Sequence, residues 1–345
     1  MAGLKQMLDP ARMGAEAEKL ERDLCARIVG QDQAVRQIVR LYQTFLAGMS
    51  PLGRPVGSLL FLGPTGTGKT LTVEAIAESL VGDPRAVVKI DCGEFQHSHE
   101  VAKLIGSPPG YLGHRETHPL LSQEAINQFQ TETVKLSFVL FDEIEKASDA
   151  VWNLLLGILD KATLTLGDNR RVDFSRAMIF LTSNLGAAEM EALIRPKLGF
   201  SIDQPDSKIE DKLAHAGTEA ARRRFTPEFM NRIDSVVTFR PLGEPELQRI
   251  LDIELDAIRA RLSNAAGEVT FAIDAAGREL LLREGTDQRY GARHLKRAIE
   301  RRLVQPLSNL VATAQIEAGD RVVIEREGDR LIFGKQTAEL VSAAA

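Results

Sequence analysis

Short apolar runs alternate with helical stretches over roughly the first two thirds of the chain. Continuous apolar runs of five to seven residues, separated by helices, are typical of parallel strands that are covered on both faces. The pattern therefore predicts an α/β domain with a five-stranded parallel sheet. The predicted strands are the runs at 58–62, 86–91, 137–142, 177–183 and 235–239. Before them, 15–47 predicts two helices that are broken near Ile28, Val29 and Gly30.

The pattern changes after Phe239. Residues 240–243 contain a proline and a glycine and predict a linker. Beyond the linker, helical periodicity extends over 244–264, 274–284 and 292–313, and 321–333 predicts a terminal β-hairpin that turns at 327–329. We therefore expect a smaller, mostly helical second domain. The expected divisions are an N-terminal helical extension (1–25), a large α/β domain (26–240) and a small helical domain (241–345).

Composition narrows the class of protein. The chain has 345 residues and a formal net charge of −5, which argues against a protein whose main partner is nucleic acid. Only two cysteines are present, Cys25 and Cys92, which excludes a disulfide scaffold and a four-cysteine zinc site. No apolar run approaches the roughly 18 residues of a membrane span, and the charged N-terminus is unlike a signal peptide. We expect a cytoplasmic protein without a membrane partner.

Residues 63–70 fit the phosphate-binding pattern G-x-x-x-x-G-K-[ST], directly between a predicted strand and a predicted helix. In that setting backbone N–H groups surround phosphate oxygens, and the helix N-terminus adds its positive end. We expect Lys69 to reach the β and γ phosphates and Thr70 to bind Mg²⁺ through its hydroxyl. A glycine-rich turn without a ligand is the alternative, and the flanking strand and helix argue against it. The predicted nucleotide-binding residues here are Gly63, Pro64, Thr65, Gly66, Thr67, Gly68, Lys69 and Thr70.

Two further predicted strands end in polar residues. The third run ends in Asp142 and Glu143, and the fourth is followed by Asn184. The carboxyl ends of parallel strands form the ligand edge of an α/β sheet. We expect Asp142 to bind Mg²⁺, directly or through water, and Glu143 to act as general base on the attacking water, which Asn184 would orient. Taken alone, an exposed acidic strand end and a turn-forming asparagine would be the simpler interpretations.

Eight motifs occur in order along the chain: IVGQDQAV (28–35), FLGPTGTGKT (61–70), GSPPGYLG (106–113), VLFDEIEKA (139–147), RRVDF (170–174), LTSNLG (181–186), RFTPEFMNRID (224–234) and RYGARHLKRAIE (289–300). Together they resemble the second, C-terminal ATPase module of Clp-type AAA+ unfoldases such as ClpB, ClpA and ClpC. The resemblance implies a P-loop AAA+ domain with a five-stranded parallel sheet, followed by a mostly helical lid domain with a terminal β-hairpin. Since the chain begins just before one module, we expect no first ATPase module and no coiled-coil middle domain.

The resemblance also implies roles for residues outside the phosphate loop. Arg232 is similar to the arginine finger, which would reach the γ-phosphate bound to a neighbouring subunit; an ordinary surface ion pair is the alternative. Arg293 resembles the sensor arginine of the small domain, which contacts the nucleotide of its own chain. Ile28 and Val29 resemble the residues that flank adenine and favour ATP over GTP. An arginine that acts in trans needs a neighbour all around a ring, so the resemblance implies a homo-hexamer.

Two loops resemble sites that handle polypeptides. Tyr111 and Leu112 lie between glycines and resemble the axial pore loop, which would grip an extended chain by aromatic packing. A tyrosine packed on its own surface is the alternative. Leu198, Gly199 and Phe200 occupy the loop where ClpA- and ClpC-type unfoldases carry a peptidase-docking tripeptide. Docking of a ClpP-type peptidase and folding back onto the same domain both remain open for this tripeptide.

These features predict an ATP-hydrolysing, Mg²⁺-dependent ring that unfolds or remodels proteins by threading them through an axial pore. The expected partners are identical subunits and polypeptide substrates, with a ClpP-type peptidase or an adaptor left open. The alternative function is a nucleotide-controlled scaffold or switch that assembles with partners without threading. A nucleic-acid initiator or loader fits the net charge of −5 less well, and no nucleic-acid partner is expected.

Overall fold

The computed structural model describes residues 9–107, 118–194, 206–286 and 291–336. The chain separates into two compact units, of which the first comprises Met1–Gly63 and Lys69–Phe239 and the second comprises Pro64–Gly68 and Arg240–Ala345. Among the described residues, no helix combines the length and the apolar character needed to cross a membrane.

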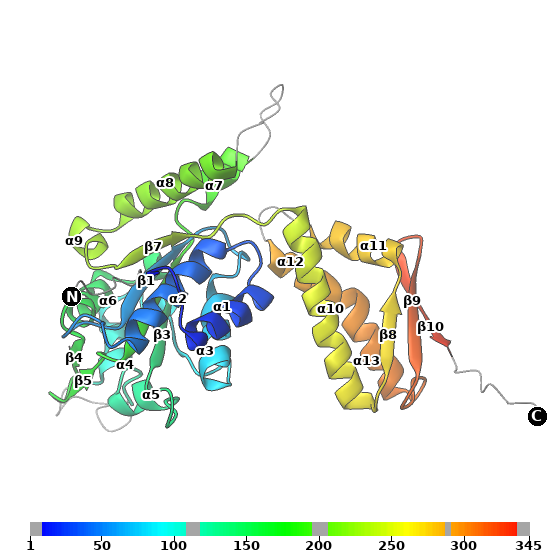
Figure 1. Ribbon diagram of the computed structural model, residues 1–345, viewed down its shortest axis with the longest axis horizontal. Coiled ribbons are helices and arrows are strands. Elements are labelled where there is room, and N and C mark those ends of the chain that lie inside the picture. Colours follow the sequence, from blue (N-terminus) through cyan, green and yellow to red (C-terminus); the bar gives the residue numbers. More distant parts are fainter. Residues whose placement is uncertain (1–8, 108–117, 195–205, 287–290, 337–345) are drawn as a thin grey trace, which may run out of the picture. The chain divides into compact units, whose positions relative to one another are not determined.

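A five-stranded sheet forms the centre of the first unit (Figure 1). The strand order is β2-β3-β6-β1-β7, and all neighbouring strands pair in parallel, which confirms the predicted fold class. The largest difference from the predicted limits is in the second strand, which begins at Val88, where pairing with Val139 starts. The strands are β1 (Gly57–Leu62), β2 (Val88–Asp91), β3 (Ser137–Asp142), β6 (Ala177–Ser183) and β7 (Ser235–Thr238).

Both faces of this sheet are covered by helices because successive side chains of each strand point to opposite faces. Leu59 and Phe61 pack with helices α1 to α3, and Leu60 and Leu62 pack on the other face with α6, α8 and α9. Every residue of β1 is buried, which explains why its sequence shows a continuous apolar run. These helices are α1 (Ala15–Arg27), α2 (Asp32–Leu46), α3 (Lys69–Val81), α6 (Asp149–Lys161), α8 (Asp206–Arg224) and α9 (Pro227–Met230).

Shorter elements complete the first unit. Helix α7 (Ala187–Ile194) lies beside α8, as Figure 1 shows. The strands β4 (Thr163–Thr165) and β5 (Arg171–Asp173) pair as an antiparallel hairpin. The remaining short helices are η1 (Cys92–Glu94), η2 (Ser98–Val101), α4 (Ala102–Ile105), α5 (Gln123–Asn127) and η3 (Ile144–Lys146).

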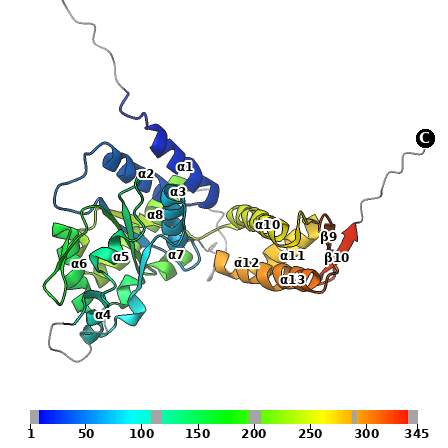
Figure 2. The same cartoon turned by 90° about the horizontal axis from the view of Figure 1, so that it is seen from below.

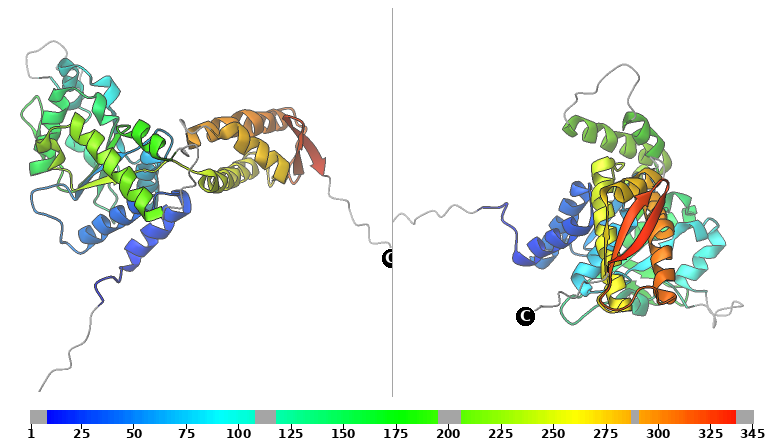
Figure 3. Two further views of the ribbon diagram at one scale, coloured as in Figure 1. Left: turned by 90° about the horizontal axis from the view of Figure 1, so that it is seen from above. Right: turned by 90° about the vertical axis from the view of Figure 1, so that its right-hand side faces the viewer.

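The second unit packs its helices around a separate apolar core. Its helices α10 to α13 lie alongside one another (Figure 2), with the β9–β10 hairpin beside them in red (Figure 3). A third strand, β8, pairs in parallel with β9, and the sequence pattern did not predict it. The predicted last helix is continuous but contains a π-helical turn, η4. The elements are α10 (Glu244–Ala266), β8 (Thr270–Ile273), α11 (Ala275–Gly285), α12 (Ala292–Ile299), η4 (Glu300–Val304), α13 (Gln305–Ala312), β9 (Arg321–Glu327) and β10 (Arg330–Gln336).

Candidate functional site

The loop between β1 and α3 turns sharply at Gly63. This glycine has φ +146°, a conformation that other residues rarely adopt, and a Cβ atom at this position would lie 2.3 Å from the carbonyl oxygen of Phe239. Gly66 and Gly68 also have positive φ angles, of +79° and +99°. The backbone can follow this path only where side chains are missing, so the glycines of the sequence pattern are explained by local geometry. This path brings the chain to the N-terminus of α3, where phosphate binds well.

We expect Gly63→Ala to lower the free energy of unfolding by at least about 2 kcal/mol, because the backbone strain is joined by a clash with a backbone oxygen. Urea denaturation would measure the change. Gly68→Ala is the matched control, since its φ angle is also strained but nothing lies within 4 Å of the added Cβ. If both variants lose the same free energy of unfolding, the clash with the Phe239 carbonyl oxygen does not contribute to the effect of Gly63→Ala.

Lys69 begins α3 and brings a nearly buried cation into the loop, with 9% of the residue exposed. Its Nζ donates to the carbonyl oxygen of Gly63 at 2.6 Å and to Oδ1 of Asn184 at 3.0 Å. A buried ammonium is costly without an anionic or strongly polar partner. A nearly buried ammonium beside a helix N-terminus fits the phosphate-binding role that we expect for Lys69.

Thr70 and Asp142 meet at the carboxyl edge of the sheet. The Thr70 hydroxyl lies 3.5 Å from Oδ2 of Asp142, and the other carboxylate oxygen of Asp142 accepts a hydrogen bond from the hydroxyl of Thr182. Hydroxyl and carboxylate oxygens are the hard ligands that Mg²⁺ prefers, and Mg²⁺ commonly takes only one or two of them from protein. The donor set therefore fits Mg²⁺ bound by Thr70 and Asp142 together with phosphate oxygens and water.

Glu143 follows β3 in a left-handed conformation, with φ +55°. Its Oε1 accepts a hydrogen bond from Nδ2 of Asn184 at 3.2 Å, and its Oε2 forms an ion pair with Lys146. The hydrogen bond to Glu143 raises the pKa of the Lys146 ammonium above its ordinary value. Asn184 thus contacts both Lys69 and Glu143, so the structure brings together three residues that the sequence analysis selected separately.

Three residues that position this network were not selected from the sequence. The Oε1 atom of Glu145 accepts the backbone N–H of Asn184 at 3.0 Å, and the Thr182 hydroxyl accepts the backbone N–H of Glu143 at 3.1 Å. Lys146 is the third, through its ion pair. All three lie within the motifs VLFDEIEKA and LTSNLG, but their spacing alone does not indicate which atoms they contact.

Among the contacts of the described residues, none joins Arg232 to this network. Its guanidinium forms ion pairs with Asp160 of α6 and with Glu228 of α9, the latter at 3.0 Å. Its carbonyl oxygen accepts hydrogen bonds from Arg54 at 3.1 Å and from the Ser58 hydroxyl at 3.3 Å. The hydrogen bond with Glu228 raises the pKa of Arg232, whose guanidinium is a permanent cation in any case. Both its side chain and its backbone are therefore held in place within the first unit.

Ile28 and Val29 are both buried where the chain leaves α1, and Ile28 packs in the core of the first unit. Arg293 lies in the first turn of α12 with an exposed side chain. The preceding residue, Ala292, donates its backbone N–H to the carbonyl oxygen of Gly66 at 3.1 Å. The start of α12 is therefore attached to phosphate-loop residues of the same unit.

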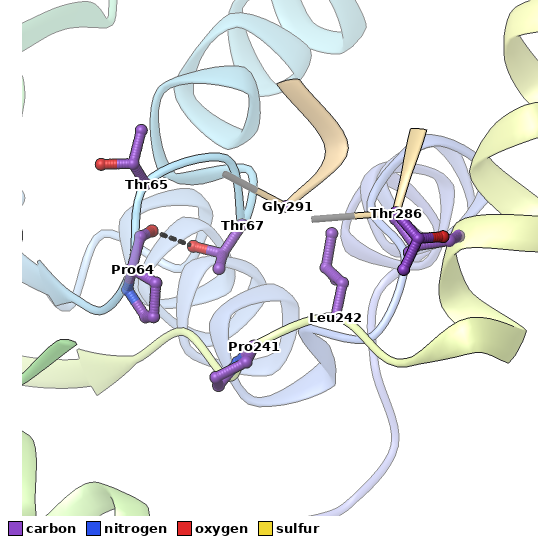
Figure 4. Close-up of a pocket in the computed structure, with 8 residues that line it drawn as sticks. Pro64, Thr65, Thr67, Pro241, Leu242, Thr286 and Gly291 are labelled. Carbon is purple, nitrogen blue, oxygen red and sulfur yellow. Dashed lines mark hydrogen bonds between the residues drawn. The ribbon is translucent and has the colours of Figure 1, made fainter. Parts of the chain in front are cut away.

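A small pocket in the second unit adjoins this attachment (Figure 4). Its volume is about 20 Å³, little more than the space of one water molecule, and too small for a nucleobase. The Thr67 hydroxyl donates to the carbonyl oxygen of Pro64 at 2.9 Å beside it. The pocket is lined by Pro64, Thr65, Thr67, Pro241, Leu242, Leu247, Thr286 and Gly291.

The two residues of the predicted pore loop, Tyr111 and Leu112, and the tripeptide 198–200 lie outside the described residues.

Comparison with known proteins identifies both units. The profile of the family described as AAA domain (Cdc48 subfamily) matches residues 54–236, and that of the C-terminal, D2-small domain of ClpB protein matches residues 242–324. The chaperone protein ClpB of Bdellovibrio bacteriovorus is 39% identical over 325 residues, which are 92% of this chain and 35% of that protein. The chloroplastic chaperone protein ClpC3 of Oryza sativa is 38% identical over 323 residues, which are 93% of this chain and 34% of that protein.

Solved structures give the same result. A closed-state structure of Hsp104 with ATPγS and FITC casein is similar with a TM-score of 0.77 and 29% identity, over 94% of this chain and 53% of that chain. An extended Saccharomyces cerevisiae Hsp104–casein complex has a TM-score of 0.78 and 27% identity over the same shares. The chain spans about a third of the length of the curated relatives. The chain belongs to the AAA family and consists of an AAA ATPase domain followed by the D2-small domain that characterises the C-terminal ATPase module of ClpB.

Proposed function

We propose that the chain is an ATP-hydrolysing, ring-forming motor that unfolds or remodels proteins by threading them through an axial pore. ATP hydrolysis is supported above all by the position of the Asn184 side chain. Its amide oxygen contacts Lys69 and its amide nitrogen contacts Glu143. A phosphate-binding cation and a carboxylate base are thereby linked through one side chain. This link makes the position of the base dependent on what Lys69 binds.

Each residue of the network has a distinct task in this proposal. Lys69 and the backbone N–H groups at the start of α3 bind and orient the phosphates. Glu143 accepts the proton of the attacking water, and Asn184 holds the carboxylate in position through its N–H group. When bound by Thr70 and Asp142, Mg²⁺ would neutralise negative charge on the phosphates.

The ring in this proposal is a homo-hexamer in which Arg232 of one subunit acts at the nucleotide of the next. The backbone carbonyl of Arg232 is held by Arg54 and Ser58, and its guanidinium, now paired with Asp160 and Glu228, is a permanent cation that would stabilise developing charge at the neighbouring nucleotide. Within its own chain, Arg293 would contact the nucleotide, and Ile28 and Val29 would flank the adenine.

The proposed substrates are unfolded or unfolding polypeptides. The presence of casein in the similar Hsp104 structures supports this substrate class, and the ClpB relatives support a chaperone role. A ClpP-type peptidase bound at Leu198, Gly199 and Phe200, or an adaptor, would be a further partner. The proposed location is the cytoplasm.

Threading can be tested with a stable fluorescent protein as substrate. We expect Tyr111→Ala to reduce its ATP-dependent unfolding at least about tenfold, with ATPase activity within about twofold of wild type, because the aromatic ring grips the chain but takes no part in hydrolysis. Tyr111→Phe keeps the ring and is the matched control. Unfolding by Tyr111→Ala at the wild-type rate would reject threading by this loop. Hydrolysis without unfolding by the wild-type protein would favour the alternative of a nucleotide-controlled scaffold.

A further inference from the structure

The turn after Glu143 is held by side chains from two helices, one that follows it directly and one that is distant in the sequence. Glu143 has a left-handed backbone, and the chain then makes the short helix η3. The carbonyl oxygen of Ile144 accepts the indole N–H of Trp152 at 3.0 Å, and that of Glu145 accepts Nη2 of Arg224 at 2.8 Å. Trp152 belongs to α6 and Arg224 ends α8, so both helices are attached to the turn that carries the proposed base.

Arg224 is itself fixed by stacking. Its guanidinium carbon lies 4.4 Å from the centre of the Trp152 ring, and Trp152 is only 8% exposed. The next residue, Phe225, packs edge-on against the same indole, with the ring centres 5.5 Å apart. A planar guanidinium can lie on an aromatic face and donate in its own plane at the same time. The hydrogen bond to Glu145 is therefore directional although Arg224 lies at the surface.

Glu145 connects this attachment to the reacting groups. Its carbonyl oxygen binds Arg224, and its carboxylate accepts the backbone N–H of Asn184 at 3.0 Å. Asn184 in turn donates to Glu143 at 3.2 Å and accepts from Lys69. A displacement of the Glu145 backbone would therefore move the Glu143 carboxylate in two ways. It would shift the turn that carries Glu143, and it would shift the Asn184 amide that orients the carboxylate.

We propose that Arg224 is a positioning residue for ATP hydrolysis, which holds the turn of Glu143 through the Glu145 carbonyl and, through the Glu145 carboxylate, the amide of Asn184. The proposal rests on the proposed hydrolytic function of this site. Arg224 acts through Glu145 and not on the nucleotide itself, so its loss affects the chemical step and leaves nucleotide binding by Lys69 in place.

The attachment itself can be tested without any hydrolysis. In Arg224→Ala we expect hydrogen exchange of the amides of Lys146 and Ala147, which close the turn onto Glu143 and Ile144, to become about tenfold faster. Trp152 is the only tryptophan of the chain, so its fluorescence should also become more accessible to acrylamide. Arg222→Ala is the matched control, because Arg222 lies on the same helix and pairs only with nearby Glu219 among the described contacts. Unchanged exchange in Arg224→Ala would overturn the proposal.

Kinetics test the consequence for the reaction. We expect Arg224→Ala to lower kcat for ATP about tenfold, with the Kd for MgATP within about twofold, and Arg222→Ala to match wild type. Arg224→Lys should recover part of the loss, since it restores a donor but not the full stacking, whereas Arg224→Met should not recover it. Equal losses in kcat and in nucleotide affinity would indicate a general structural role and overturn the proposal. If wild type binds ATP without hydrolysing it, the proposed function fails, and hydrogen exchange alone decides whether Arg224 holds the turn.

Discussion

Replacement of Glu143 by glutamine is expected to reduce ATP turnover by about 10²- to 10⁴-fold while leaving ATP binding intact. Glutamine has the same length and can still accept the hydrogen bond from Asn184, so the network around Lys69 is preserved. What is lost is a carboxylate that can take a proton from water. Single-turnover hydrolysis and equilibrium binding of a fluorescent ATP analogue, measured on the same protein, would separate the two effects.

The ion pair between Glu143 and Lys146 requires its own control, because the substitution also removes the partner of this ammonium. Lys146→Met breaks the same pair and keeps the carboxylate. We expect Lys146→Met to lose less than about tenfold in turnover, since exposed ion pairs contribute little and the base is retained. A loss as large as that of Glu143→Gln would mean that the ion pair, rather than proton transfer, explains the result.

Arg232→Ala is expected to lower turnover by about 10³-fold or more, with ATP binding retained, because a guanidinium that stabilises transferred phosphoryl charge has effects of this size. The substitution also leaves Asp160 and Glu228 without their cation. A loss of folding stability from these carboxylates would appear in thermal unfolding and can be measured separately. If the Tm of Arg232→Ala equals that of the wild-type protein, the lower turnover comes from the lost catalytic contact and not from unfolding.

Mixing experiments decide whether Arg232 acts on a neighbouring subunit. Arg232→Ala and Glu143→Gln are each expected to be inactive, but a mixed ring contains sites with Glu143 from the first variant and Arg232 from the second. Activity should therefore reappear on mixing and depend on the ratio of the two. The double variant mixed with Arg232→Ala supplies no intact arginine and should remain inactive. Failure of the two single variants to complement one another, although they assemble together, would place the action of Arg232 within its own chain.

The apolar pattern predicted the central sheet because its strands are buried on both faces. Strand β1 is buried at every position, so its sequence carries no alternation and stands out as one run. Strand β8 (Thr270–Ile273) is different, since it has four residues of mixed burial and pairs with β9, from which helices α11 to α13 separate it in the sequence. A segment this short and irregular in polarity has no distinguishing pattern, and only its pairing with β9 defines it.

The sequence by itself determined the loop at 63–70 and the polar strand ends at Asp142 and Asn184, because backbone geometry and strand ends are encoded by neighbouring residues. The tertiary structure alone decided which atoms meet. Asn184 and Lys69 are 115 positions apart, and Arg224 and Glu145 are 79 apart, so no local pattern reports their hydrogen bonds. Such contacts arise from the order of the strands and the packing of α6 and α8 on the sheet, which bring distant side chains to one edge.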